Sequence, residues 1–211
     1  MKPAMSSSSK VQQLRPSLGS LPALPPPRLS GGLPLMDALS LRHSARSFSP
    51  RPLSPQIISD LLWVAAGINR ADSGGRTAPS ARNWQEIEVY AAMADGVYRY
   101  RPRGHRVDKV LDEDIRADTG QQDFVAAAPL TLIYVADLRR IEAASATERR
   151  FYTAADCGFV AENVYLYCAS EGLATVVRGL IDRPALASRM KLSQQQRVLL
   201  AQSIGYHAAD G

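Results

Sequence analysis

Residues 150–171 read RFYTAADCGFVAENVYLYCASE, and this stretch predicts the longest helix of the chain. Gly172 follows it and would end the helix, as glycine often does just past a helix C-terminus. Apolar residues recur at helical spacing on two faces, one of small residues (Ala154, Ala155, Gly158, Ala161, Val164) and one of larger residues (Phe159, Tyr165, Leu166). A helix that is apolar on more than one face must be surrounded. We therefore expect it at the centre of the fold, with another helix, or the sheet of the same chain, against the small residues.

Two cysteines, Cys157 and Cys168, lie eleven residues apart in this helix. A rise of about 1.5 Å per residue separates them by more than a disulfide can span, so we expect free thiols. The three histidines are scattered and no CxxC pair is present, so no metal site is expected. The sequence also lacks a Walker loop, a GxGxxG fingerprint and a GxSxG elbow, which disfavours the classes that depend on them.

The segments around this helix predict a mixed fold. Residues 130–136 (LTLIYVA) are apolar and rich in β-formers, and predict a buried central strand. Further strands are expected at 86–93, 97–101, 174–177 and 197–203, and helices at 35–41, 54–68, 121–127 and 182–190, with the acidic residues 112–114 at a helix N-terminus. Because these elements do not follow a strict βαβ rhythm, we expect an α+β three-layer domain rather than a doubly wound one.

The N-terminal 34 residues differ from the rest in composition. They hold seven of the 14 prolines and the run Ser6–Ser9, which predicts a flexible leader over 1–34 and one folded domain over 35–211. Residues 1–36 carry four basic residues and no acid, whereas 21 basic residues face 20 acids in the remainder, so most of the net charge of +5 belongs to the leader. The nearly neutral body argues against nucleic-acid binding. With no secretory signal and no apolar stretch of about 20 residues, we expect a cytoplasmic protein without a membrane span.

Two polar segments could bind a ligand. Residues 42–48 (RHSARSF) place two guanidinium groups and a hydroxyl within five residues, a set suited to one phosphate group, although a solvated basic turn would look the same. Residues 79–85 (PSARNWQ) offer two side-chain amides, an arginine and free backbone groups, which could pair with the polar edge of a planar heterocycle. The alternative is a loop in which Ser80 caps one helical turn and Asn83 closes it.

The order and spacing of these segments resemble the nitroreductase family of flavin mononucleotide (FMN) oxidoreductases, from about Leu35 to Tyr206. The family motif Arg-x-Ser-x-Arg/Lys-x-Phe is met by Arg42, Ser44, Arg46 and Phe48, and Pro-Ser-x-x-Asn-x-Gln by Pro79, Ser80, Asn83 and Gln85. A Gly-Leu strand that ends in glycine before Asp is met by Gly172, Leu173, Gly179 and Asp182, and the closing Gly-Tyr by Gly205 and Tyr206.

The resemblance implies a central, mostly antiparallel sheet flanked by helices, and a homodimer paired through the long helix with FMN at the interface. It implies that Arg42 and Ser44 hold the FMN phosphate with His43 nearby, and that Arg46 reaches the flavin near N1 and O2. Asn83 and Gln85 would bond the ring or ribityl, with Pro79, Ser80 and Ala81 of the partner subunit against the ring. Val177, Arg178 and Gly179 would lie by the N5 side, and Arg46 or Arg82 would stabilise the anionic reduced flavin.

The activity implied is ping-pong hydride transfer through flavin N5, from NADH or NADPH to nitroaromatics, quinones or a similar small acceptor, with no side chain needed as a catalytic acid. The alternatives are another flavin reaction on the same scaffold, such as heterocycle dehydrogenation or flavin fragmentation, and a non-catalytic flavin- or nucleic-acid-binding protein. Two features depart from the family pattern. Arg178 stands where many members have an acid, and the chain stops at Gly211 without a C-terminal Lys or Arg for the phosphate, leaving His207 alone there.

Overall fold

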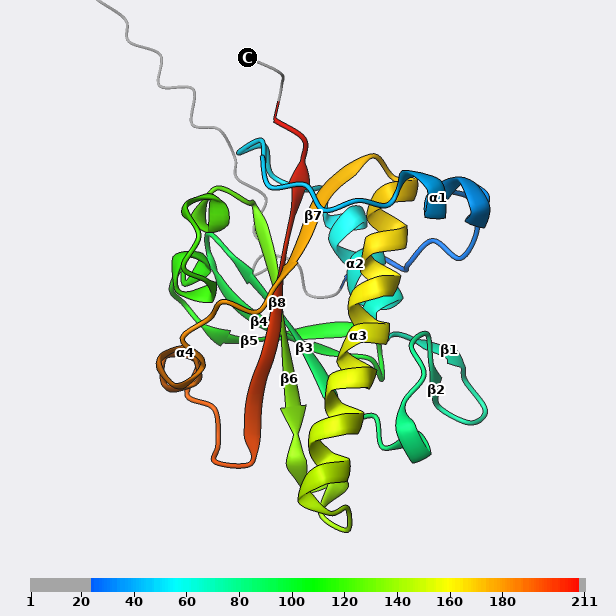
Figure 1. Cartoon of the computed structure of the whole chain (residues 1–211). Helices are drawn as coiled ribbons and strands as arrows, with labels where there is room; N and C mark the ends of the chain where they lie inside the picture. The colour runs from blue at the N-terminus through cyan, green and yellow to red at the C-terminus, as the bar shows by residue number, and fades with distance from the viewer. Residues whose placement is uncertain (1–23, 209–211) are drawn as a thin grey trace, which may run out of the picture.

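The computed structural model describes residues 24–208, which build a six-stranded sheet between two layers of helices (Figure 1). The strands are β3 (Ile87–Met93), β4 (Gly96–Arg101), β5 (Arg106–Leu111), β6 (Leu130–Asp137), β7 (Leu173–Arg178) and β8 (Gln196–Tyr206). They lie in the order β5-β4-β3-β6-β8-β7, and every neighbouring pair is antiparallel. The predicted α+β class with a mostly antiparallel central sheet is confirmed.

Strand β6 lies inside the sheet, and all eight of its residues are buried. Successive side chains of a strand point to opposite faces, so the sheet supports two hydrophobic cores. Leu132 and Tyr134 face the core shared with the long helix, whereas Ile133 and Val135 face the core on the other side. This explains why the segment is apolar at every position rather than alternating, as predicted for a central strand.

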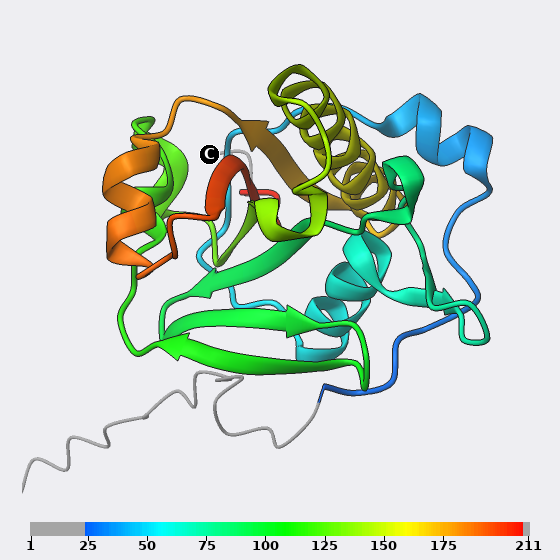
Figure 2. The same cartoon turned by 90° about the horizontal axis from the view of Figure 1, so that it is seen from below.

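Three helices cover one face of the sheet and smaller elements cover the other (Figures 1 and 2). The first layer holds α1 (Leu35–Leu41), α2 (Pro55–Ala66) and α3 (Ala146–Ser170), with α1 and α2 both packed on α3. The other layer holds α4 (Arg183–Arg189) and the 3₁₀ turns η3 (Arg116–Thr119) and η4 (Asp123–Ala126). Side-chain caps fix three helix starts, because Ser54, Ser145 and Asp182 each accept a backbone N–H of the first turn.

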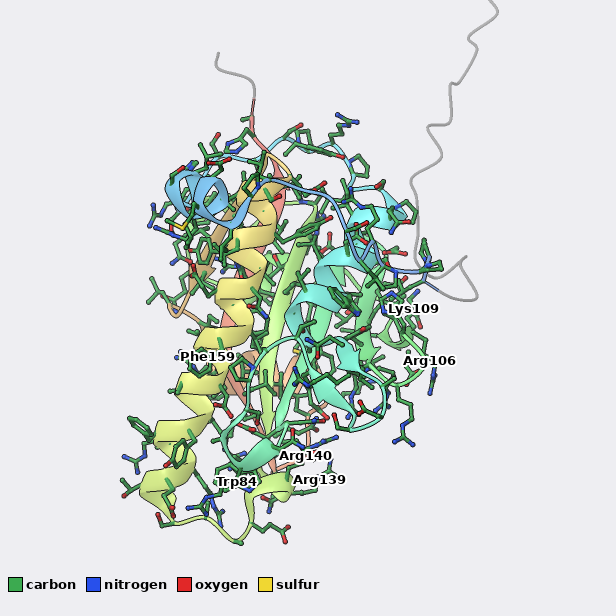
Figure 3. All side chains as sticks on the ribbon, turned by 90° about the vertical axis from the view of Figure 1, so that its right-hand side faces the viewer. Trp84, Arg106, Lys109, Arg139, Arg140 and Phe159 are labelled. Carbon is green, nitrogen blue, oxygen red and sulfur yellow. The ribbon has the colours of Figure 1, made fainter. Side chains whose placement is uncertain are left out.

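Neither of the two predicted apolar faces of helix α3 is fully covered by the described part of its own chain. Val160 and Val164 pack into the core, whereas Gly158 is exposed and a Cβ added there would meet no atom within 4 Å. The prediction that Phe159 is buried was wrong within one chain, because its side chain is 48% exposed and lies on the outer side of α3 (Figure 3). Phe151, on the same helix, is 66% exposed. Part of the apolar surface of α3 therefore has no cover from residues 24–208 of its own chain.

Four local features differ from the sequence predictions. A strand that the sequence did not predict, β5, pairs with β4 and ends at Leu111. The acidic residues 112–114 follow it as bends and begin no α-helix; Asp114 instead accepts the backbone N–H of Arg116 at 3.1 Å. The helix expected at 121–127 is the single 3₁₀ turn η4. The loop after α2 holds a small hairpin of β1 (Ile68–Arg70) and β2 (Gly75–Arg76).

Residues 24–34, assigned from the sequence to a flexible leader, lie on the domain instead. Arg28 binds the buried carboxylate of Asp60 through its backbone N at 2.8 Å and its Nε at 2.6 Å, and Glu171 through Nη2 at 2.8 Å. Leu24 is buried in the main core, and the Leu33 backbone N donates to Ser170 Oγ at 2.7 Å. The sequence did not predict this packing, because residues 24–34 contain few apolar residues and are held mainly by polar contacts. Residues 1–23 lie outside the described residues, so for them the flexible leader stays a prediction.

Both cysteines are free and buried in α3, as predicted. Burial raises the pKa of the Cys157 thiol to about 12, so this sulfur stays protonated and behaves as a small apolar group. Within residues 24–208, no helix is long and apolar enough to cross a bilayer.

Candidate functional site

The first predicted segment, residues 42–46, lies beside the C-terminal half of α3 and strand β7. Ser44 Oγ is 2.9 Å from the Tyr165 hydroxyl, and the same hydroxyl accepts the backbone N–H of Val177 at 2.8 Å. The Arg42 guanidinium lies 5.4 Å from the centre of the Tyr165 ring. Tyr165 therefore joins Arg42, Ser44 and Val177. The sequence places Tyr165 only on an apolar face of the predicted helix, and nothing in its neighbouring residues indicates these contacts with Ser44 and Val177.

The cations of this segment have no acidic partner. Among the described residues, no ion pair involves Arg42, which is half-buried, or Arg46, which is exposed. The His43 ring stacks on that of His207, with centroids 6.0 Å apart. The Ala45 backbone N donates to the Thr175 carbonyl at 2.9 Å, which fixes the segment to β7. Two uncompensated guanidinium groups and a hydroxyl on a fixed backbone can bind an anion.

The second predicted segment, residues 79–85, is a loop with unusual backbone geometry. It contains the 3₁₀ turn η2 (Ala81–Asn83), and Arg82, Asn83 and Gln85 have φ values of 50°, 54° and 53°. Non-glycine residues with positive φ are uncommon and persist where the surroundings hold them, which is frequent at ligand sites. Ser80 Oγ does not cap the turn. It accepts the Gln85 backbone N–H at 2.8 Å instead, so the loop is braced across its base.

Two buried carboxyl groups support this loop from below. Asp156 of α3 accepts the Ala81 backbone N–H at 2.8 Å, and Glu86 accepts the Ser80 hydroxyl at 3.2 Å. Burial, together with the nearby charge of Asp156, raises the pKa of Glu86. The other Glu86 oxygen, Oε1, has no hydrogen-bond partner within the described part of the chain. The buried carboxyl groups of Asp156 and Glu86 therefore hold the backbone of the loop in place, and this fixes the direction of its exposed side chains.

The polar side chains of the loop are held by contacts within the chain. Gln85 is held inside the chain, because its Oε1 accepts from Arg76 Nε at 3.0 Å and its Nε2 donates to the Gly74 carbonyl at 3.1 Å. Arg82 pairs with Glu148 at 3.0 Å. Of the two arginines predicted to stabilise a reduced flavin, Arg46 has no such partner and is the more available.

The third predicted segment divides between the two faces of β7. Val177 lies on the Tyr165 side, whereas the Arg178 guanidinium is buried on the other side, where it donates to the Thr119 carbonyl at 2.7 Å and hydroxyl at 3.1 Å. Burial lowers the pKa of Arg178 to about 10. Its side chain is therefore directed away from Ser44. Gly179 is exposed, and a Cβ there would make only ordinary contacts, so packing does not require glycine.

The structure does not bring residues 42–46 and 79–85 together in one chain. Tyr165 marks the first segment and Asp156 the second, and these residues are nine apart on α3. At about 1.5 Å per residue, they are separated by roughly 13 Å along the helix axis. The two predicted segments thus lie at different heights of the longest helix of the chain.

Comparison with known proteins settles the family. The family model described as the nitroreductase family matches residues 39–206, most of the chain. This chain belongs to the nitroreductase family. The match confirms the resemblance drawn from the motifs at 42–48 and 79–85, and it places the protein among oxidoreductases.

Individual nitroreductase relatives agree in sequence and fold. A protein of Methanocaldococcus jannaschii named "Putative nitroreductase MJ1384" is 31% identical over 176 residues, covering 79% of this chain and 88% of the relative. A crystal structure of a "putative nitroreductase" from Ralstonia eutropha JMP134 has a TM-score of 0.86 at 45% identity, covering 89% of this chain and 90% of that one. The NADPH:FMN oxidoreductase of Vibrio harveyi, solved with NAD+, shares the fold at 18% identity and a TM-score of 0.63, covering 82% of this chain and 68% of that one.

Proposed function

We propose that this nitroreductase is an FMN-dependent oxidoreductase that uses NADH or NADPH to reduce nitroaromatics, quinones or a similar small acceptor. The observation that carries the proposal is that Arg42 and Arg46, on either side of Ser44 in the sequence, have no ion-pair partner among residues 24–208. An anionic phosphate would neutralise both charges, so these residues fit the phosphate of FMN. The name of the Vibrio harveyi neighbour supports the same cofactor and donor.

The protein residues would bind and orient, while bound FMN supplies the redox chemistry by accepting a hydride at N5 and passing it on. Arg42 and Ser44 would hold the phosphate, with His43 nearby, and Tyr165 would position Ser44. Arg46 would stabilise negative charge at the N1 and O2 edge of the ring. The Val177 and Gly179 backbone would lie along the N5 side, and Arg178 would contribute only its backbone there, because its side chain is turned toward Thr119.

We further propose a homodimer in which each FMN site combines residues 42–46 of one chain with residues 79–85 of the other. Each chain leaves apolar side chains exposed on α3, with Phe151 at 66% and Phe159 at 48%, and on α1, with Leu35 at 63% and Met36 at 73%. Large exposed apolar side chains on two helices that pack together favour an interface there. Since Asn83 and Gln85 belong to the same braced loop as Pro79, Ser80 and Ala81, all five would come from the partner subunit.

The absorbance of the purified protein tests the cofactor and the reaction together. We expect a yellow protein with FMN absorbance that bleaches when NADH or NADPH is added under argon, and that recovers when a quinone or nitroaromatic follows. A colourless protein that binds no added FMN would contradict the proposal. Bound flavin that neither donor bleaches would instead favour another flavin reaction on this scaffold, such as heterocycle dehydrogenation or flavin fragmentation, or a flavin-binding protein without catalysis. The location in the cytoplasm stays a prediction.

A further inference from the structure

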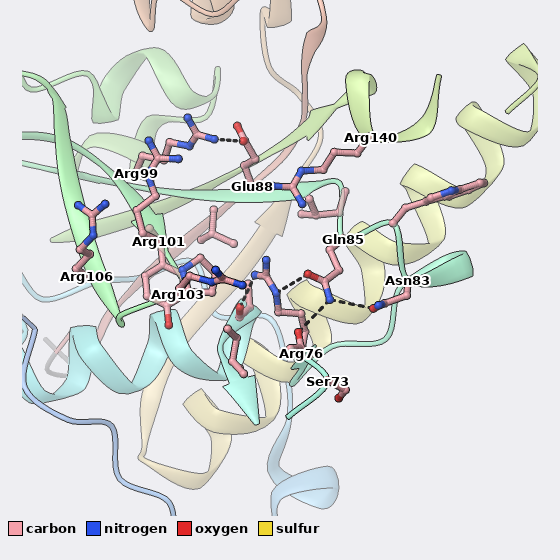
Figure 4. Close-up of a pocket in the computed structure, with 18 residues that line it drawn as sticks. Ser73, Arg76, Asn83, Gln85, Glu88, Arg99, Arg101, Arg103, Arg106 and Arg140 are labelled. Atoms are coloured by element: carbon pink, nitrogen blue, oxygen red, sulfur yellow. Dashed lines mark hydrogen bonds and ion pairs between the residues drawn. The ribbon is translucent and has the colours of Figure 1, made fainter. Parts of the chain in front are cut away.

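A second concentration of positive charge lies outside the proposed FMN-phosphate site. A cavity of about 740 Å³ opens where β3 begins and β4 ends, a volume within the usual range for small-molecule sites. Six arginines line it: Arg76, Arg99, Arg101, Arg103, Arg106 and Arg140 (Figure 4). Glu88 is the only acidic residue in its lining. The cavity therefore carries a large excess of positive charge in a protein whose body is nearly neutral.

Three of these arginines are compensated within the chain. Arg99 pairs with Glu88, and Arg101 Nε lies 2.5 Å from Asp108, which also pairs with Arg106. These pairs belong to the β4–β5 hairpin and the start of β3, and they form one wall of the cavity. Their charges are already partly satisfied, so they do not by themselves call for a ligand.

The other three, Arg76, Arg103 and Arg140, have no carboxylate partner among the described residues. They come from three separate elements: β2, the β4–β5 turn and the 3₁₀ turn η5 (Leu138–Ile141). Asp137, next to Arg140 in space, is occupied by both Nε and Nη2 of Arg139 at 2.7 Å each. Asp137 therefore acts on Arg140 only through its charge, without a direct ion pair, and Arg140 in turn repels Arg76.

Arg76 is the most constrained of the three. It is half-buried, and its Nη1 donates to the Ala66 carbonyl at 2.8 Å while its Nε is held by Gln85. Burial and then the charge of Arg140 lower the pKa of Arg76. In Figure 4, Arg76 and Arg140 extend from different elements into the space between the labelled arginines. A fixed, partly desolvated cation that faces another cation gains most from an anion placed between them.

We propose that this cavity is a binding site for the phosphate groups of a small ligand, with Arg76, Arg103 and Arg140 as the residues that bind them. Arginine presents forked donors that match phosphate oxygens, and a phosphate or diphosphate brings more charge and more acceptors than a single carboxylate. Trp84 also lines the cavity and offers an aromatic surface beside the charged groups.

The position of the cavity suggests whose phosphate it binds. Asn83, Trp84 and Gln85, from the loop that we propose contacts FMN, form part of its lining. If the proposed function holds, a phosphate bound here belongs to a substrate next to the flavin, either the NAD(P)H donor or a phosphorylated acceptor. The anion site itself does not depend on FMN, since one chain supplies all of its residues.

Titration calorimetry with pyrophosphate tests the site, on the purified protein with and without saturating FMN at low, constant ionic strength. We expect wild-type protein to bind pyrophosphate, and Arg103→Gln and Arg140→Gln each to weaken the binding by about tenfold or more, since each removes a charged contact. Arg189→Gln, which removes an exposed arginine of α4 that does not line the cavity, is the control and should bind normally. Arg42→Gln should lose FMN affinity but keep pyrophosphate bound in the cavity.

No binding to the wild-type protein, or equal binding by the Arg103 and Arg140 variants, would overturn the proposal. These results do not require FMN, so they are distinct from a failure of the proposed oxidoreductase function, which the flavin absorbance reports. Adding NADH or NADPH then separates the two sources. Displacement of pyrophosphate assigns the site to the donor, and retention assigns it to a phosphorylated acceptor.

Discussion

At the scale of single residues, the proposed contact between Arg42 and the FMN phosphate can be measured as a change in FMN affinity. Replacing Arg42 with Ala removes one charged hydrogen-bonding group, which is worth about 1.5 to 3 kcal/mol, so FMN affinity should fall at least tenfold. Quenching of FMN fluorescence measures both affinities, and Arg189→Ala serves as the control because it removes an equal charge on the opposite face of the sheet. Equal affinities for wild type and Arg42→Ala would place the phosphate elsewhere.

Arg28 and Asp60 give a prediction for stability and its pH dependence. Burial alone would raise the pKa of Asp60, but hydrogen bonds from the Arg28 backbone and guanidinium, from Gln56 and from Tyr167 hold it below the ordinary value. A lowered carboxyl pKa stabilises the folded state above the unfolded pKa, and that stability is lost as the pH falls through the folded one. Asp60 should thus stabilise the protein at neutral pH, and this contribution should begin to fall below about pH 4 and be lost as the pH passes through the lower folded pKa.

Arg28→Ala should lower the free energy of unfolding at pH 7 by about 1 to 2 kcal/mol, a reduced figure because the Arg28 side chain is 46% exposed. Urea unfolding at pH 7 and at pH 3 measures the effect, which should be smaller at the lower pH. Asp60→Asn in the same background is the control, since it removes the unpaired charge and should recover part of the loss. An effect of the same size at both pH values would mean that the ion pair does not carry it.

At the scale of elements, helix α3 is the proposed dimer interface, and this proposal can be tested by a substitution on its exposed surface. The exposed position of Gly158 makes it a clean probe, because an added side chain meets no atom of its own chain. We expect Gly158→Glu to keep the folded structure of the subunit while placing a charge in the proposed dimer seam. Circular dichroism should stay unchanged, and light scattering and flavin absorbance should report dissociation and loss of FMN together. A dimeric, flavin-loaded Gly158→Glu protein would show that α3 does not form the interface.

The elements with strong local signals were predictable, and those held by distant partners were not. Ser54-Pro55 and Asp182 mark helix starts through their own backbone contacts, and residues 130–136 are apolar at every position because both faces of β6 are covered. Strand β5 shows no such pattern, since it lies at the sheet edge, three of its six side chains are charged, and all six are at least partly exposed. Residues 24–34 looked unable to pack because their anchor, Asp60, lies 32 residues beyond Arg28.

The candidate site shows the same division. The motifs at 42–48 and 79–85 carry their residue types in the sequence, so they could be predicted. The role of Tyr165 depends on its contacts with Ser44 and Val177, which lie 121 and 12 residues away in the chain. The direction of Arg178 depends on strand parity and on Thr119, 59 residues earlier. The basic cavity is lined by β2, the β4–β5 turn and η5, which are too far apart in the sequence to be recognised as one cluster.

At the scale of the whole molecule, the exposed faces of α1 and α3 and the separated half-sites lead to the same assembly. One chain has a mass of 22.9 kDa. We therefore expect the FMN-bound protein to have about twice that mass by light scattering, with one flavin per chain. A single-chain mass with flavin retained would refute the dimer.

Subunit complementation tests the central claim, that each FMN site is shared between two chains. Arg42→Ala and Asn83→Ala each damage a different half of the site, and mixed dimers of the two can be isolated with two affinity tags. If the halves come from different chains, one site of each mixed dimer keeps both native halves and the other carries both defects. The shared-site account predicts that mixed dimers recover one FMN site of wild-type affinity, measured by fluorescence quenching. Mixed dimers in which neither site binds FMN as tightly as wild type would contradict it.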